Sequence, residues 1–201
     1  VAFLEQKHNF GNTYRSLGNV QAEYKVHSFE ELKLVANLGY DYSSGRSFGN
    51  TDIDYVVPAE AGSYYERTQD KKNLLMDLYV NYNKTVESLN TNFDVTGGYT
   101  YQDFRNNRTE FSYDAQNDVF NTQIPLKERL NLQSFFGRAT VTIADKYILN
   151  GSIRADGSSR FTEDFRWGDF PSAAFAWKIN EEEFVKNVSA ITNLKLRLGW
   201  G

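Results

Sequence analysis

The chain lacks cysteine, long apolar runs and an excess of positive charge, and each absence removes a class of protein. Its 201 residues contain no cysteine, which excludes a disulfide framework and thiolate metal sites. The formal net charge is −4, so no basic field would attract nucleic acid. No run of about 18 apolar residues is present, and we therefore expect no transmembrane helix.

Signals of enzymatic chemistry are also scarce. The two histidines are His8 and His27, and no nucleophile-elbow pattern accompanies either of them. Asp52 and Asp54 are an acidic pair that could bind a cation, but a solvated loop explains them more simply. We therefore expect neither an enzyme nor a metal or cofactor site.

The two ends of the sequence are unlike those of a complete exported protein. The chain begins at Val1 without an initiator methionine, shows no signal peptide, and finishes on the strand-like LKLRLGWG. We interpret it as a piece of a longer protein, so the missing signal peptide does not argue against export.

Aromatic and period-two patterns are what the sequence has in abundance. It contains 13 Tyr and 15 Phe, which favour strands. Apolar residues alternate with polar ones over long stretches, which is the period of a strand rather than a helix. The alternation predicts an all-β, antiparallel up-and-down meander of about eight strands, at residues 18–26, 32–43, 74–83, 93–102, 135–143, 147–156, 173–179 and 194–200.

The predicted connections alternate in length. Those after the first, third and fifth strands are short, and those after the second, fourth and sixth are long and polar, near 44–72, 103–128 and 157–169. The connection after the seventh strand contains EEEFVKN (181–187), which predicts one or two helical turns. Short turns at one end and long loops at the other are typical of transmembrane β-barrels.

Two folds fit period-two strands, and they place the apolar face differently. A soluble sandwich would bury that face, whereas a membrane barrel would turn it toward lipid. Strands of ten residues or more, many small residues on the apolar face, and Tyr and Trp near strand ends favour the barrel. The residues that separate the two folds are Leu78, Val80, Phe93, Val95, Val141, Ile143, Leu149 and Ile153.

Three motifs in the C-terminal part of the chain point to a known family. They are FFGRATVTIADKYILNGSIRADGSSRF (135–161), RWGDFPSAAFAWKINEEEFVKN (166–187) and NLKLRLGWG (193–201). In this order they closely resemble the barrel of SusC/RagA-type TonB-linked outer-membrane proteins, over about the last 70 residues. The first 130 residues resemble the family in general character but contain no motif of comparable specificity. The similar segments there are LEQ near the start, LGYDYSSGR, and NYNKT followed by ES and N.

The resemblance implies a location, a function and partners. The chain would be part of a TonB-dependent receptor β-barrel domain (1–201) in the outer membrane, without the plug domain and the remaining strands. The family imports nutrients such as oligosaccharides or peptides, with a SusD-like surface lipoprotein as a lid and energy from the TonB complex. It also implies that the ADK turn (144–146) and EEEFVKN are periplasmic, and that the three long loops are extracellular.

Two groups of residues are candidates for a functional role. Arg154, Asp156 and Arg160 are expected to form a charge cluster on the lumen side, where charge satisfaction is the simpler explanation and plug docking the alternative. Candidates for contact with substrate or lid are Tyr64 and Tyr65 in a long loop, and Phe165 and Trp167 in the 157–169 loop. For Phe165 and Trp167 the alternative is an aromatic girdle at the membrane interface. A soluble or surface-anchored β-domain for adhesion or ligand binding remains the alternative function.

Overall fold

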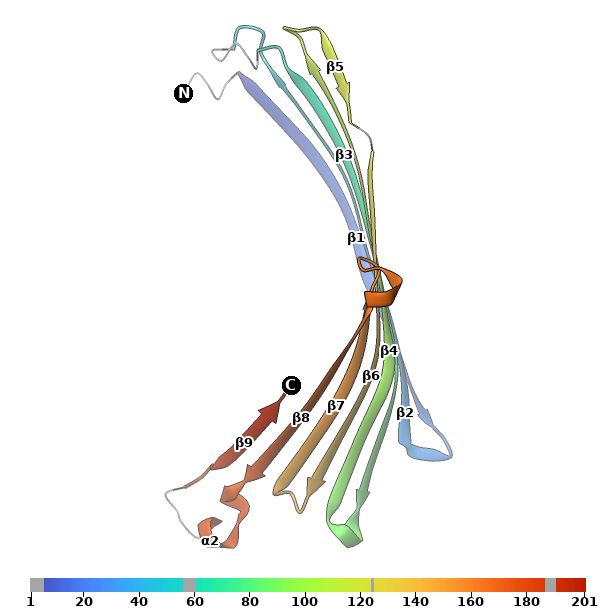
Figure 1. Ribbon diagram of the computed structural model, residues 1–201, viewed down its shortest axis with the longest axis vertical. Helices are drawn as coiled ribbons and strands as arrows, with labels where there is room; N and C mark the ends of the chain where they lie inside the picture. The colour runs from blue at the N-terminus through green and yellow to red at the C-terminus, as the bar shows by residue number, and fades with distance from the viewer. Residues whose placement is uncertain (1–5, 56–60, 124, 187–190) are drawn as a thin grey trace. The chain divides into compact units, whose positions relative to one another are not determined.

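One sheet contains all the strands of the chain that the structure describes. The computed structural model describes residues 6–55, 61–123, 125–186 and 191–201. Consecutive strands pair in the antiparallel order β1-β2-β3-β4-β6-β7-β8-β9, and a short β5 pairs with β4 (Figure 1). The strands are β1 (Lys7–Val26), β2 (Phe29–Thr51), β3 (Tyr64–Val86), β4 (Thr91–Asp114), β5 (Val119–Thr122), β6 (Leu126–Ile143), β7 (Tyr147–Ser158), β8 (Trp167–Lys178) and β9 (Lys195–Trp200).

The predicted meander is confirmed, but most strands are longer than predicted. Each of the eight expected strands lies within an observed strand to within one residue at its ends. The segments expected as long loops are largely strand, because β2 continues to Thr51, β3 begins at Tyr64 and β4 continues to Asp114. Hydrophobic alternation ends before these strands do, since polar residues stand on both faces of the extensions.

Contacts divide the chain into two compact units. Unit 1 comprises Val1–Asn19, Gly39–Leu74 and Asp103–Leu130, and unit 2 comprises Val20–Leu38, Leu75–Gln102 and Asn131–Gly201. Strands β1 to β4 and β6 contribute residues to both units.

The strands of unit 2 are joined by tight turns at one end (Figure 1). Ala144 and Asp145 connect β6 to β7 with φ values of 51° and 56°, and Lys146 N donates to Ile143 O at 3.0 Å. Two positive φ values make this a type I′ turn, whose twist matches that of the strands it joins. Ala144 N also donates to Asn90 O at 2.7 Å, which ties this turn to the turn between β3 and β4.

Short helices follow β8, as the EEEFVKN segment predicts. They are η4 (Ile179–Glu181) and α2 (Glu183–Lys186), and Asn187 lies outside the described residues. No helix among the described residues is long and apolar enough to cross a membrane.

Glu182, between η4 and α2, joins three elements at the turn end of unit 2. Its carboxylate accepts hydrogen bonds from Tyr147 Oη at 2.6 Å, Lys146 Nζ at 2.9 Å and Trp177 Nε1 at 3.0 Å. These hydrogen bonds, the one from Tyr147 first, lower the pKa of Glu182 to about 2. The pKa of Lys146 is raised in turn, chiefly by its hydrogen bond to Glu182.

The apolar face of the sheet has no second layer over it in the described residues. Within those residues the buried apolar side chains are only Val35, Tyr55, Ala61 and Val185. Six of the eight residues that separate sandwich from barrel are exposed, and Phe93 and Val141 are half-buried. A sandwich would have buried all eight in a dry core. The arrangement is that of a barrel wall, and the soluble alternative is not supported.

Aromatic rings gather on the apolar face at both ends of unit 2. At the turn end, Tyr147 and Trp177 stack with ring centroids 6.2 Å apart. At the other end, Phe135 contacts Tyr99 at 5.0 Å and Trp167 at 5.9 Å. Two aromatic bands that flank an apolar zone match the interfacial girdles of membrane barrels.

Unit 1 is held by ion pairs between neighbouring strands. Arg15 Nε lies 2.8 Å from Asp41 Oδ1, and Arg67 Nε lies 3.0 Å from Glu110 Oε2. The short β5, which the sequence did not indicate, pairs with the end of β4 through Phe111↔Thr122 to Asp114↔Val119. These polar contacts explain why strands persist where the hydrophobic pattern has ended.

Candidate functional site

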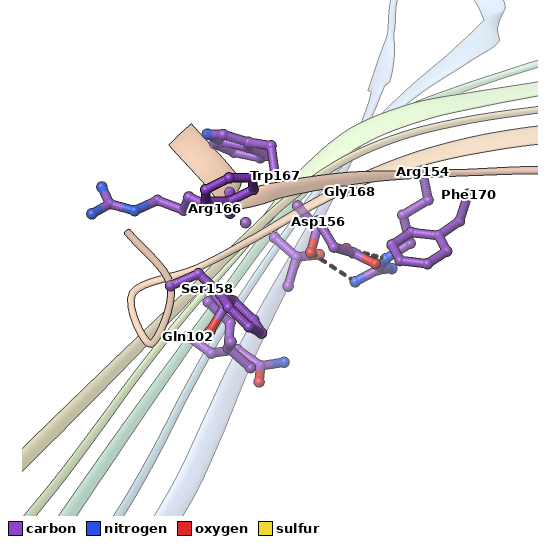
Figure 2. A pocket seen from close by; sticks show the side chains of 14 residues that line it. Gln102, Arg154, Asp156, Ser158, Arg166, Trp167, Gly168 and Phe170 are labelled. Atoms are coloured by element: carbon purple, nitrogen blue, oxygen red, sulfur yellow. Dashed lines mark hydrogen bonds and ion pairs between the residues drawn. The ribbon is translucent and has the colours of Figure 1, made fainter. Parts of the chain in front are cut away.

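A hollow of about 410 Å³ lies in unit 2 on the polar face of the sheet, beneath the connection between β7 and β8 (Figure 2). Strand alternation brings its polar members together, because every second residue of a strand shares a face. The cross-strand partners Ser134↔Asp156 and Asp156↔Gly168 place β6, β7 and β8 side by side here. The side chains that the hollow presents are chiefly Gln102, Ser134, Arg154, Asp156, Phe165 and Phe170.

Arg154 and Asp156 form an ion pair on the wall of this hollow. Arg154 Nε donates to Asp156 Oδ1 at 2.6 Å, and its Nη2 donates to Ser134 Oγ at 2.9 Å. Ser134 is buried, so its hydroxyl holds the guanidinium in one orientation. Both charged side chains remain partly exposed, at 46% and 38%, and can still hydrogen-bond to a ligand.

Arg160 does not join this pair. Its side chain is exposed, and among the described ion pairs none connects it to Asp156. The contact that anchors it is made by its backbone, since Arg160 N donates to Ser158 Oγ at 3.4 Å. The structure thus brings together two of the three residues predicted as a cluster, because the chain turns after Ser158 and carries Arg160 past the strand.

The connection after β7 is a short, hydrogen-bonded turn rather than an open loop. Ser159 N donates to Asn131 O, Asn131 N donates to Ser159 Oγ, and Ser158 N donates to Arg166 O, at 2.9, 2.9 and 3.1 Å. A helical turn, η3 (Glu163–Phe165), completes it. Of the predicted loop 157–169, the first two residues belong to β7 and the last three to β8.

The two aromatic candidates of this connection have different surroundings. Both residues border the hollow, and the side chain of Phe165 is 76% exposed. The Trp167 ring stacks on Phe135 and lies on the other side of the ribbon from Asp156 and Gln102 (Figure 2). Trp167 thus belongs to the aromatic band on the apolar face, whereas Phe165 is available to a ligand in the hollow.

Gly157 makes the position of Trp167 possible. The two residues are cross-strand partners, and a Cβ at position 157 would lie 3.0 Å from three atoms of the indole ring. A side chain there would push the indole away from the sheet. The glycine of the DGSSRF motif therefore has a packing role.

Tyr64 and Tyr65 are not in a loop, contrary to the prediction. They are the first residues of β3, in unit 1. Tyr64 Oη donates to Glu66 Oε2 at 3.1 Å and its ring packs edge-on against Phe111, while Tyr65 Oη donates to Asn9 Oδ1 at 3.1 Å. Their hydroxyls are held by neighbouring side chains, and neither residue lines the hollow of unit 2.

Sequence reasoning missed Gln102 and Ser134 as members of the hollow. Each stands at a polar-face position of its strand, so the alternation contained the signal for the face. The alternation could not show that β4 pairs with β6, because a long connection separates these two strands in the sequence. The hollow offers a charged pair, an amide, a hydroxyl and exposed rings, which suit hydrogen bonding and stacking of a polar ligand.

Comparison with known proteins agrees with this architecture. The model of the family "TonB dependent receptor-like, beta-barrel" matches residues 3–201. The chain is 37% identical over 214 residues to the TonB-dependent receptor SusC of Bacteroides thetaiotaomicron, covering 100% of this chain and 20% of that protein. It is 30% identical over 206 residues to the TonB-dependent receptor P39 of Formosa agariphila, covering 90% of this chain and 19% of that protein.

Solved structures show the same fold. The RagAB peptide transporter superposes with a TM-score of 0.87 at 17% identity, over 98% of this chain and 23% of the matched chain. The ferric preacinetobactin receptor BauA of Acinetobacter baumannii gives a TM-score of 0.52 at 16% identity, over 87% of this chain. The chain thus spans about a fifth of the length of the curated relatives it matches, and its strands lie in the outer membrane. It belongs to the TonB-dependent receptor-like β-barrel family.

Proposed function

We propose that the protein containing this chain imports a nutrient, such as an oligosaccharide or a peptide, across the outer membrane with energy supplied through TonB. The chain supplies part of the barrel wall, and further strands and a plug domain complete the transporter. The observation that carries this proposal is the polarity of the sheet in unit 2. Its apolar face is exposed, while charged residues such as Lys33, Asp77 and Arg138 lie on the other face. Family membership supports the same conclusion.

A SusD-like surface lipoprotein is the partner that we propose on the extracellular side. The similarity to SusC and to the barrel of the RagAB transporter supports a two-component assembly. The extended strands of unit 1 are suited to contact it, because their ends carry exposed aromatic and polar side chains such as Phe48 and Phe120.

Within the wall, we propose that the hollow beside Arg154 and Asp156 contacts material inside the lumen, with Phe165 as its ligand-facing ring. Its position on the polar face supports this role, because the opposite face meets lipid. The exposed Phe165 and Phe170 support it further, since aromatic rings that face water are well placed to stack on a ligand. Trp167 has an interfacial role instead.

Uptake in intact cells tests the import function. A strain in which the gene for the full-length protein is deleted is supplied with a mixture of labelled oligosaccharides and peptides, and the remaining medium is analysed by mass spectrometry. We expect one class of nutrient to stay in the medium, and uptake to return when the wild-type gene is restored. Restored uptake should stop when an uncoupler collapses the proton gradient.

The control for this experiment is a restored gene that lacks the plug region but keeps the barrel. It should leave energised uptake at the level of the deletion strain. Unchanged uptake of every nutrient after deletion, or restored uptake that continues with the uncoupler, would contradict the proposed function.

A further inference from the structure

A second hollow, of about 400 Å³, lies in unit 1 on the apolar side of the sheet. Tyr40, Tyr42 and Leu74 line it, and all three belong to the alternating apolar positions of β2 and β3. Each is at least 36% exposed, so no part of the described chain covers this surface. The hollow therefore opens on the side that meets lipid rather than on the lumen side.

Charged residues line the same hollow, although it faces the lipid side. Lys72 and Arg105 are members of it, and Arg129 of β6 lies beside Arg105 through a shared carboxylate. Strand alternation places Lys72 on the side of Leu74, and Arg105 on the side of Asp103. Asp70, two residues before Lys72, lies on the same side, so three cations and two carboxylates leave an excess of positive charge on this surface.

Asp103 fixes the two arginines. Its side chain is only 2% exposed and accepts from Arg105 Nη2 at 2.8 Å and from Arg129 Nη2 at 2.9 Å. The Nε atoms of both arginines donate to the same carboxylate at 3.1 Å. The side chains of Arg105 and Arg129 are nevertheless 47% and 55% exposed. The buried Asp103 therefore orients both guanidinium groups, while their remaining N–H groups stay available to a ligand.

Lys72 is positioned by an aromatic ring. Its Nζ lies 5.5 Å from the centroid of the Tyr42 ring, within the range of a cation–π contact. This contact keeps the ammonium over the hollow and beside the apolar Leu74. A cation between apolar side chains and arginines suits the level of a membrane at which headgroups meet acyl chains.

We propose that this hollow binds a phosphate group on the headgroup of a lipid in the outer leaflet of the outer membrane. Arginine presents paired N–H donors that match phosphate oxygens, and lysine adds a point charge. The apolar members Leu74 and Tyr40 then contact the first part of the acyl chains. The site rests on the outer-membrane location of the chain and does not depend on import activity.

The surroundings argue for a lipid rather than for a soluble anion or an acidic peptide. Asp41 also borders the hollow, but its side chain points to the opposite face, where it is paired with Arg15. An anion carried by the imported nutrient would meet that face. A soluble anion would gain nothing from the exposed leucine and tyrosines around the cations. An amphiphile with a phosphate at its head satisfies both the charged and the apolar parts of the hollow.

Lipid binding to the purified full-length protein tests the proposal. The probe is a bisphosphorylated lipid A in detergent micelles, compared by native mass spectrometry with the same lipid after removal of both phosphates. We expect the wild-type protein to prefer the bisphosphorylated form. In the double variant Lys72→Gln/Arg105→Gln we expect this preference to fall by about 30-fold, at about fivefold for each basic group.

Lys71 and Arg108 provide the matched control, because they lie on the same strands as the test residues but on the opposite face. The variant Lys71→Gln/Arg108→Gln should keep the full preference, and both variants should show the heat-dependent gel shift of a folded barrel. Equal loss in both variants, or no preference in the wild type, would overturn the proposal. So would displacement of the lipid by a soluble sugar phosphate at equal concentration, because binding would then owe nothing to the apolar surface.

Discussion

Tyr147 donates its phenolic proton to the carboxylate of Glu182 at 2.6 Å, and this contact joins β7 to the helical turn after β8. Both residues belong to the motifs that suggested the family, as do Lys146 and Trp177, the other two donors to the same carboxylate. Tyr147 and Glu182 are 35 residues apart in the sequence, so the two motifs meet at one anion.

The depressed pKa of Glu182 predicts a loss of stability in acid. A carboxylate with a lowered folded pKa adds stability above its unfolded pKa of 4.5, and that stability disappears as the pH falls toward about 2. Thermal unfolding of the full-length protein in detergent should therefore shift to lower temperature between pH 5 and pH 2, by about a few degrees. Glu182→Gln should flatten this part of the profile. An identical profile for the variant would contradict the role of Glu182.

Trp167 and Phe165 should separate stability from transport. Trp167→Ala removes the stack on Phe135, so the free energy of unfolding should fall by about 1–2 kcal/mol while uptake per folded molecule stays unchanged. Phe165→Ala removes an exposed ring, so stability should change by less than about 0.5 kcal/mol while uptake falls. Denaturant titrations and initial uptake rates on the same preparations measure both. The opposite pattern would show that the two rings have exchanged roles.

Two carboxylates offer a comparison between a buried and an exposed ion pair. Asp103→Asn leaves Arg105 and Arg129 facing each other without their shared anion, and should cost about 1–3 kcal/mol of unfolding free energy. Asp156→Asn acts on an exposed pair and should cost less than about 1 kcal/mol. Raising the salt concentration should reduce the second cost. Equal costs for the two variants would show that burial of Asp103 is not what matters.

Single cysteines in the otherwise cysteine-free chain test its orientation in the membrane. We expect a membrane-impermeant thiol reagent to label Thr68→Cys and Asn107→Cys on intact cells that make the full-length protein. Asp145→Cys should react after the outer membrane is opened, and Val141→Cys should stay protected in lipid. Equal labelling of positions 68, 107 and 145 in intact cells would reverse or abolish the proposed topology.

The sequence predicted the face of each strand well and the ends of the strands poorly. Where one face meets lipid, as in β7, alternation between Leu149 and Asn150 is required, and the period-two pattern follows. Where neither face meets lipid, nothing enforces alternation, so the outer parts of β2, β3 and β4 looked like loops. Ion pairs such as Arg67 with Glu110 hold those parts, and such pairs are visible only once the strands are aligned.

Only part of the candidate site was predicted, because a local pattern shows contacts within a strand but not contacts between strands. Arg154 and Asp156 are two residues apart on one strand, so their meeting follows from the strand alone. Ser134 and Gln102 come from other strands, and their place depends on a pairing that no local pattern specifies. Arg160 was misplaced because the tight turn after Ser158 is closed by backbone hydrogen bonds that involve Asn131 and Arg166.

Lys71 and Lys72 lie on opposite faces of the sheet, and this alternation limits how the length of a strand can change. In a single-layer sheet, loss of one residue from β3 before Asn73 would exchange the two faces for the rest of that strand, so Leu74 and Leu78 would face the lumen and Asn73 would face lipid. Deletions or insertions of single residues should therefore be tolerated only in the connections, such as 115–118 between β4 and β5. Within the strands, length can change only in steps of two residues. The barrel wall should therefore tolerate substitutions far better than changes in strand length.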